Sequence, residues 1–216
     1  MYKPIIHNNL WINRWYVFSK KLNREVILYG PLEYDHWVLI EMDPLVTNYC
    51  EKPLEISHSY FGKPDKALID MWVEKNKKEE FISITYTQTI ERDNKQFSSD
   101  TFEKINSIKL WTQANNKNHK VITDHNVYSN SILLDNLKLL LPYNYPISTI
   151  NPGLKKKIVD CISGGVQNLL DLEARIAIDD DPFEIQKTIY MLIINKLVLS
   201  NIDMKPIGPE TEVYLV

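Results

Sequence analysis

A single carboxylate, Asp70, stands inside an otherwise apolar run of the sequence and is the first candidate for chemistry. It lies in the segment Ala67–Val73, whose other members are all apolar. A second run, Phe81–Thr87, follows a charged tip, Glu74–Glu80, and this order predicts a β-hairpin. A carboxylate in a buried strand is costly unless it is paired, protonated or bound to a metal. We therefore expect one of these three states for Asp70.

The second strand of this hairpin is predicted to have one polar and one apolar face. Small hydroxyl side chains alternate along it with apolar ones: Ser83, Thr85 and Thr87 against Ile82, Ile84 and Tyr86. On one interpretation Asp70 and the hydroxyl face share a pocket. On the other, the hairpin lies at the edge of a sheet with one face in water. The pattern leaves both open.

A second acid, Glu33, follows the dipeptide Gly30-Pro31, which predicts the start of a helix that ends near Asp43. An acidic residue in a first turn interacts favourably with the helix dipole, and this is the ordinary role for Glu33. The sharper hypothesis is an active-site carboxylate, because Glu33 lies one turn before Trp37 and not on an obviously polar face.

Composition sets limits on the classes of protein. The chain has 216 residues, 44% hydrophobic and 25% charged, which is typical of one ordinary domain with a smaller one. Its net charge of −3 gives no overall nucleic-acid signature, so any DNA contact must come from local patches. Cys50 and Cys161 are far apart and match no metal-ligand spacing, which indicates buried thiols in a reducing compartment. The five histidines form no ligand pair.

No signal peptide and no apolar stretch of the ~20 residues needed to span a bilayer is found in the sequence. We therefore expect a cytoplasmic protein that makes no membrane contact.

The order of elements up to residue 141 predicts an α/β or α+β layer with helices on its faces. Strands are expected at Trp15–Ser19, Glu25–Tyr29 and 46–59, and then in the hairpin. Helices are expected at Thr101–Asn115, where Ser99 or Asp100 can act as the cap, and at Asn126–Leu141, with the strand His119–Thr123 between them.

Four Pro or Gly residues between 141 and 153 indicate a domain boundary, which divides the chain into 1–148 and 149–216. Three helices are expected after it, at Leu154–Ser163, Asn168–Ile176 and Pro182–Asn195, and then two strands, Lys196–Asn201 and Glu212–Val216. Three helices and a β-ribbon predict a winged helix-turn-helix domain.

The run from residue 24 to 54, R-E-V-I-L-Y-G-P-L-E-Y-D-H-W-V-L-I-E-M-D-P-L-V-T-N-Y-C-E-K-P-L, resembles the N-terminal signature of TnsA, the endonuclease subunit of heteromeric transposases. In that family an acid in "DLE" on a helix precedes "LEW…V…I.EQ.PL". The segment A-L-I-D-M-W-V at 67–73 resembles the family's "TDFLV" strand, whose aspartate binds metal. The segments at 103–111 and 121–124 resemble the next helix and strand, and the similarity is collinear over about residues 14–216.

The resemblance implies a restriction-endonuclease-like fold in which Glu33 and Asp70 hold Mg²⁺ within about 5 Å of each other. Such a site cuts a phosphodiester by activating water and stabilising the leaving oxygen with the metal. It also implies three partners: transposon-end DNA, a DDE transposase that cuts the 3′ ends while this subunit frees the 5′ ends, and an ATP-dependent regulator that binds the C-terminal domain.

One departure from the family concerns its third element, Gln-x-Lys, which this chain replaces with Ser83-Ile84-Thr85. Threonine supplies no positive charge to orient and help deprotonate water or to stabilise the phosphate. Lys104 or Lys109 on the next helix, or Gln88 as a metal ligand, are the candidate substitutes. The catalytic set to be tested is therefore Glu33, Asp70, Ser83 and Thr85.

Two classes of function follow from this departure. The first is a metal-dependent endonuclease subunit. The second is a catalytically inactive nuclease-fold protein that assembles or docks on DNA, in a transposon, phage or defence system.

The winged helix is predicted to bind protein and not DNA. Its third helix begins D-D-D-P-F-E at residues 179–184, and four acids there would face the phosphates of a major groove. The only basic run, Lys155-Lys156-Lys157, is short. This agrees with the regulator contact that the resemblance implies.

Overall fold

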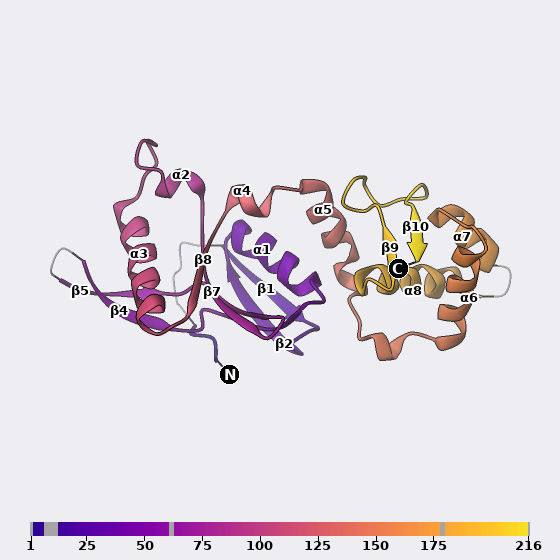
Figure 1. Cartoon of the computed structure of the whole chain (residues 1–216), viewed down its shortest axis with the longest axis horizontal. Helices are drawn as coiled ribbons and strands as arrows, with labels where there is room; N and C mark the ends of the chain where they lie inside the picture. Colours follow the sequence, from indigo (N-terminus) through magenta and orange to yellow (C-terminus); the bar gives the residue numbers. More distant parts are fainter. Residues whose placement is uncertain (1, 7–12, 61–62, 178–179, 216) are drawn as a thin grey trace. The chain divides into compact units, whose positions relative to one another are not determined.

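The computed structural model describes residues 2–6, 13–60, 63–177 and 180–215 (Figure 1). Their contacts divide the chain into two compact units. The first, the N-terminal unit, comprises residues 1–41 with 45–129, and the second, the C-terminal unit, comprises 42–44 with 130–216.

A four-stranded mixed sheet forms the centre of the N-terminal unit, with strand order β3-β6-β7-β8. β3–β6 and β6–β7 pair antiparallel, whereas β7 and β8 pair parallel. The strands are β3 (Val46–Glu51), β6 (Met71–Lys75), β7 (Lys78–Thr85) and β8 (Asn118–Thr123). The predicted α/β core is confirmed as a mixed sheet flanked by helices.

The β6–β7 hairpin has a shorter tip than the sequence predicts. Its strands continue to the pair Lys75–Lys78, and the turn consists of Asn76 and Lys77 alone, with φ of 51° and 62°. Two consecutive left-handed residues form a tight hairpin turn whose twist matches that of the strands. The predicted first strand is also wrong in its extent, because β5 ends at Leu68 and β6 begins at Met71, which leaves Asp70 at the join.

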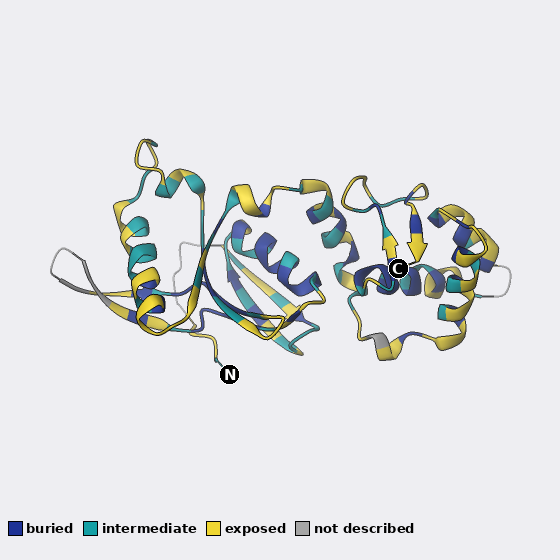
Figure 2. Ribbon diagram, viewed as in Figure 1, coloured by how far each residue is buried: buried dark blue, intermediate teal, exposed yellow. Residues whose placement is uncertain are grey.

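Helices α1 (Pro31–Met42) and α3 (Ser99–Ala114) cover opposite faces of the sheet. On one face Trp37 of α1 donates a hydrogen bond from Nε1 to the hydroxyl of Tyr49 at 2.7 Å. On the other face Ile108 of α3 packs in a cluster with Cys50, Trp72 and Phe81. Cys50 is the residue after Tyr49 on β3. Because adjacent strand residues point to opposite faces, both surfaces of the sheet are buried. In Figure 2 most of α1 has the colours of buried and intermediate residues.

Two further strand pairs and a short helix complete this unit. β1 (Arg14–Ser19) pairs antiparallel with β2 (Arg24–Tyr29), as predicted, and β4 (Glu55–Tyr60) pairs antiparallel with β5 (Lys63–Leu68). The helix α2 (Thr87–Ile90) was not expected. The cap of α3 is Ser98, which accepts a hydrogen bond from the Thr101 amide, and not Ser99 or Asp100.

The helix predicted over residues 126–141 is two helices, α4 (Asp124–Val127) and α5 (Ser131–Leu140). The break comes at Asn130, whose side chain accepts a hydrogen bond from the Leu133 amide and starts a new helix. Contacts group α5 with the C-terminal unit, since the amide of Asn136 donates to the carbonyls of Ile202 and Lys205 at 2.7 Å each. The division at residue 148 that the sequence predicts instead groups this helix with the first domain.

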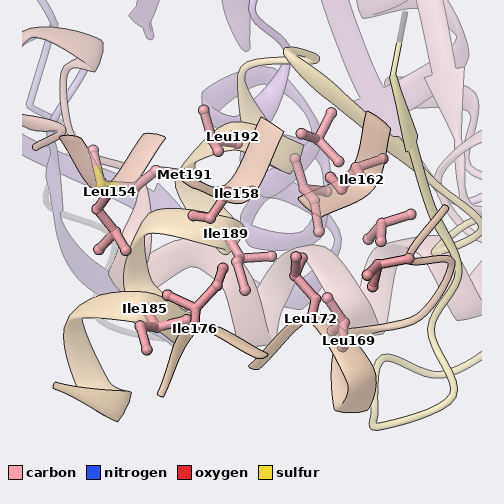
Figure 3. Packing of buried hydrophobic residues seen from close by; sticks show 14 of the residues in the cluster. Leu154, Ile158, Ile162, Leu169, Leu172, Ile176, Ile185, Ile189, Met191 and Leu192 are labelled. Atoms are coloured by element: carbon pink, nitrogen blue, oxygen red, sulfur yellow. The ribbon is translucent and has the colours of Figure 1, made fainter. Parts of the chain in front are cut away.

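The C-terminal unit continues through two 3₁₀ turns, Leu141–Tyr143 and Ile147–Thr149, into three helices and an antiparallel pair of short strands. These are α6 (Pro152–Ser163), α7 (Leu169–Ile176), α8 (Pro182–Ile194), β9 (Val198–Ser200) and β10 (Val213–Leu215). The predicted order of three helices and two strands is confirmed. Apolar side chains from all three helices meet in one cluster (Figure 3): Leu154, Ile158, Ile162, Leu169, Leu172, Ile176, Ile185, Ile189, Met191 and Leu192.

Within the described ranges, every helix is too short or too polar to cross a bilayer.

Candidate functional site

Asp70 lies between β5 and β6 and is only 5% exposed. Each of its carboxylate oxygens is occupied by hydrogen-bond donors. Oδ2 accepts from the amide of Ile84 on β7 at 2.9 Å, and Oδ1 accepts from Lys52 Nζ at 2.9 Å and from Lys104 Nζ at 3.2 Å. Of the three states expected for this buried acid, the structure therefore shows pairing with cations.

Glu33 reaches the same place from the first turn of α1. Its Oε2 accepts a hydrogen bond from the Tyr29 amide at 3.0 Å, just before the helix, and its Oε1 accepts from Lys52 Nζ at 2.6 Å. One nitrogen therefore bonds to both carboxylates, although the two acids are far apart in the sequence. The structure brings together the two acids that the sequence singles out.

Lys52 is the functional residue that sequence reasoning missed. It follows β3 directly, its side chain is 7% exposed, and its φ is +44°, which is uncommon for a residue with a side chain. Its amide also donates to the carbonyl of Asp70 at 2.9 Å, so backbone and side chain are both tied to that residue. Burial alone lowers the pKa of Lys52, but the charges of Asp70 and Glu33 outweigh it and the pKa is raised.

Lys104 approaches from α3, on the opposite side of the sheet from α1, and its side chain remains 34% exposed. Of the candidate substitutes for the missing lysine, this is the one that contacts an acid of the site. Lys109 and Gln88 are exposed. Although Ser83-Ile84-Thr85 supplies no positive charge, two ammonium groups reach Asp70 from other elements.

The two acids have unequal proton affinities. Burial raises the pKa of Asp70, but Lys104 and Lys52 together hold it well below its usual range. Burial also raises the pKa of Glu33, and there the single ammonium of Lys52 does not outweigh burial and the nearby charge of Asp70. Asp70 is therefore the stronger acid of the pair, and Glu33 is the carboxylate that accepts a proton more readily.

Ser83 and Thr85, which stand in place of the family's Gln-x-Lys, bond to neighbours other than the acids. Ser83 is buried, and its Oγ lies 2.9 Å from Nε2 of His119 on β8. The Oγ1 of Thr85 lies 2.8 Å from that of Thr89 on α2. Both residues are on the strand that donates the Ile84 amide to Asp70, so they flank the site without adding charge to it.

His36 lies one turn beyond Glu33 on α1 and is 6% exposed. Its Nδ1 has no hydrogen-bond partner in the described part of the chain. Burial, helped by the charge of Lys120, lowers the pKa of His36 to about 4. A neutral histidine is therefore buried next to the charged cluster.

The chemistry of the acid pair fits a divalent metal ion with few protein ligands. No group of three or more Asp, Glu, His or Cys side chains suited to a metal is found among the described residues. Mg²⁺ needs only one or two carboxylates when water and substrate phosphate fill its other positions. Oε2 of Glu33 and Oδ2 of Asp70 each accept one hydrogen bond from a backbone amide, whereas Oε1 of Glu33 and Oδ1 of Asp70 face the ammonium of Lys52.

Neither a scan against protein-family models nor a search of curated proteins finds a match for this chain. The functional argument therefore depends on the geometry of the site.

Proposed function

We propose that this chain is a TnsA-like subunit of a heteromeric transposase, which cuts phosphodiester bonds at transposon ends together with a DDE transposase and an ATP-dependent regulator. One observation carries the proposal. An acid at the start of a helix, Glu33, and an acid at the start of a strand, Asp70, converge on one lysine nitrogen at 2.6 Å and 2.9 Å. The sequence resemblance requires this pair and this placement.

The order of elements around the site supports a restriction-endonuclease-like core. The helix α1 precedes three antiparallel strands, β3, β6 and β7, and the helix α3 leads to β8, which runs parallel to β7. Glu33 belongs to the first helix, α1, and Asp70 lies at the join between β5 and β6. The amide of Ile84, which donates to Asp70, belongs to β7. The site thus lies where three consecutive parts of such a core meet.

In the proposed reaction Glu33 and Asp70 hold the metal, which activates water and stabilises the leaving oxygen when it is bound. Asp70 stays ionised at neutral pH because two ammonium groups lower its pKa, so it is the permanent anionic ligand. Burial and the charge of Asp70 raise the pKa of Glu33 despite Lys52, so Glu33 accepts a proton more readily than Asp70 does. Lys104 is partly exposed and supplies positive charge where a phosphate approaches.

Lys52 and Lys104 replace, by position, the charge that Ser83-Ile84-Thr85 lacks. An ammonium need not come from a particular strand to act on a phosphate, because what matters is where the charge lies relative to the reacting oxygen. The presence of these two cations supports the enzyme form of the proposal.

A second candidate function is the inactive assembly protein, and a specific contact favours it. Lys52 Nζ bridges Glu33 and Asp70, so two positive and two negative groups neutralise each other in the buried cluster. In that case the cluster stabilises a nuclease scaffold that docks on DNA or on the transposase, and no bond is cut.

The C-terminal unit is proposed to be a winged helix that binds the regulator. At the start of α8, Asp181 accepts from the Phe183 amide, Asp180 pairs with Lys157 at 2.5 Å, and Phe183 is 59% exposed. A helix start with exposed acids and an exposed aromatic ring is repelled by phosphates and is suited to a basic, apolar protein surface. Glu184→Lys is expected to weaken the regulator complex, measured by calorimetry, whereas tight salt-dependent duplex binding by the unaltered unit would contradict the assignment.

A cleavage assay separates the two functions. Transposon-end DNA is incubated with the transposase, Mg²⁺ and either the native chain or Asp70→Asn, with the exposed Asp93→Asn as the matched control. The enzyme function predicts 5′-end nicks that Asp70→Asn reduces at least ~10³-fold and that Asp93→Asn leaves unchanged. Absence of nicks from the native chain, with transposition unaffected by Asp70→Asn, would establish the assembly function instead.

A further inference from the structure

The ammonium of Lys52 stands where a cation shared by the two acids would stand. It contacts Glu33 Oε1 at 2.6 Å and Asp70 Oδ1 at 2.9 Å, and it is nearly inaccessible to water. We infer that Lys52 and a divalent metal ion compete for one position between Glu33 and Asp70, so that the metal enters only when the lysine side chain moves out. This inference depends on the proposed metal site of the chain.

Geometry makes the two occupants exclusive at Oε1 of Glu33 and Oδ1 of Asp70, the two oxygens that Lys52 contacts. A Mg²⁺ ion binds carboxylate oxygens at about 2.0–2.1 Å, which is closer than the ammonium lies now. An ion placed between the same two oxygens would therefore overlap the position of Nζ. Asp70 Oδ1 already accepts from both Lys52 and Lys104, so it has no lone pair for a third partner while both lysines stay.

Electrostatics adds to this exclusion. The cluster of Glu33, Asp70, Lys52 and Lys104 is neutral, whereas a divalent ion is attracted by net negative charge. Removing the charge of Lys52 leaves one net negative charge at the pair and frees the oxygen of Glu33 that it occupied. Metal affinity is therefore expected to rise when this lysine is neutralised.

Separate contacts hold the backbone of Lys52 and the end of its side chain. Its backbone is held independently by the bond from its amide to the Asp70 carbonyl at 2.9 Å. The end of the side chain is held by the two carboxylates and by the ring of Tyr29, whose centre is 5.4 Å from Nζ. Displacement by a metal would therefore break the contacts at the end of a long, unbranched side chain and leave the backbone bond of Lys52 in place.

The test is Mn²⁺ binding by the full-length chain without DNA, followed by electron paramagnetic resonance and by thermal unfolding. The variant Lys52→Met keeps the length of the side chain and removes its charge. We expect it to bind Mn²⁺ at least ~10-fold more tightly than the native chain and to gain thermal stability on Mn²⁺ addition. The matched control Lys104→Met removes a partly exposed lysine whose acidic partner among the described residues is Asp70, and we expect a gain below ~3-fold.

Equal Mn²⁺ affinity of Lys52→Met and the native chain, or no binding by either, would overturn the inference. If Lys52→Met does not fold, the native chain answers the question through the ¹⁵N signals of lysine ammonium groups during Mg²⁺ titration. Competition predicts that the Lys52 signal shifts as the site fills, and saturation without a shift would overturn it. Failure of the proposed function is a separate result, since a native chain that never nicks DNA can still show this competition.

Discussion

Both units of this chain bury apolar side chains, and they differ in the charged groups that lie among them. The N-terminal unit places four charged side chains, Glu33, Asp70, Lys52 and Lys104, in one cluster between its sheet and helices, three of them nearly or fully buried. The C-terminal unit buries a cluster of apolar side chains between α6, α7 and α8 (Figure 3). An apolar core of this kind is favoured by burial alone, whereas a buried charge cluster holds only if every member keeps its partner.

This difference indicates where selection acts for stability and where it acts for chemistry. Hydrophobic residues of similar volume could replace a buried ion cluster with little loss of stability, so charges at such a position point to a use beyond folding. The C-terminal core needs no such explanation. Substitutions in the two units should therefore differ in size and in their dependence on conditions.

The largest effect is expected from Asp70→Ala. It leaves Lys52 and Lys104 without their shared partner, and the loss of one member of a buried pair costs about 3–5 kcal/mol. Urea unfolding followed by hydrogen exchange over residues 31–123 measures this loss. The exposed Asp93→Ala is the control and should change the unfolding free energy by less than ~0.5 kcal/mol. Equal effects of the two variants would show that the charge cluster is not structurally coupled.

Leu172→Ala is expected to come next. The side chain is fully buried in the C-terminal cluster, so its truncation loses hydrophobic burial and leaves a cavity, at a cost of about 2–5 kcal/mol. The neighbouring Leu170 is 53% exposed, and Leu170→Ala should cost less than ~0.5 kcal/mol. The same urea measurement over residues 152–215 tests this, and a salt-dependent loss would contradict the assignment of an apolar core.

His36 gives the N-terminal unit a pH dependence that the C-terminal core lacks. Its pKa is lowered from 6.5 to about 4, so below pH 6.5 the unfolded chain binds a proton that the folded chain does not. Stability contributed by neutral His36 is therefore present above pH 6.5 and is lost as the pH falls toward 4, by about 3 kcal/mol. The variant His36→Gln should reduce the change in unfolding free energy between pH 6.5 and 4. An unchanged pH profile of the unfolding free energy would contradict this prediction.

The smallest effects are expected at helix caps, which occur in both units. Ser98 accepts a hydrogen bond from the Thr101 amide at 3.2 Å, and Asn168 accepts one from the Asp171 amide at 2.8 Å. Ser98→Ala and Asn168→Ala should each cost about 1 kcal/mol, because a cap is a local interaction in either unit. Ser99→Ala, next to the first cap, is the control, and a loss as large as that of Ser98→Ala would show that the cap is misassigned.

Pattern in the sequence predicts much of the fold because the forces that set it are local. Alternation and β-branched residues give the strands on both sides of the β6–β7 turn, and the periodic apolar residues give α3 and α6–α8. Predictions at boundaries fail where one side chain decides. Asn130 starts a new helix inside a continuous helical pattern, and Asn76 with Lys77 tightens a turn inside a charged run.

For the candidate site, the two acids and Lys104 could be found from the sequence, whereas Lys52 could not. Asp70 is visible because a carboxylate in an apolar run needs a partner, and Glu33 because of its place at a helix start. Lys52 stands in the short polar gap C-E-K-P-L between two strands, where a lysine ordinarily faces water. Its position just after a predicted strand and before a proline is the only local signal, and only the fold shows that Asp70 lies beside it.

A crystal structure of the full chain soaked in Mn²⁺, with anomalous scattering to locate the ion, tests the central claim most directly. The account predicts an anomalous peak between the carboxylates of Glu33 and Asp70, with the Lys52 ammonium displaced from its present bridging position. A metal-saturated crystal without a peak there, and with Lys52 still bonded to both acids, would contradict it.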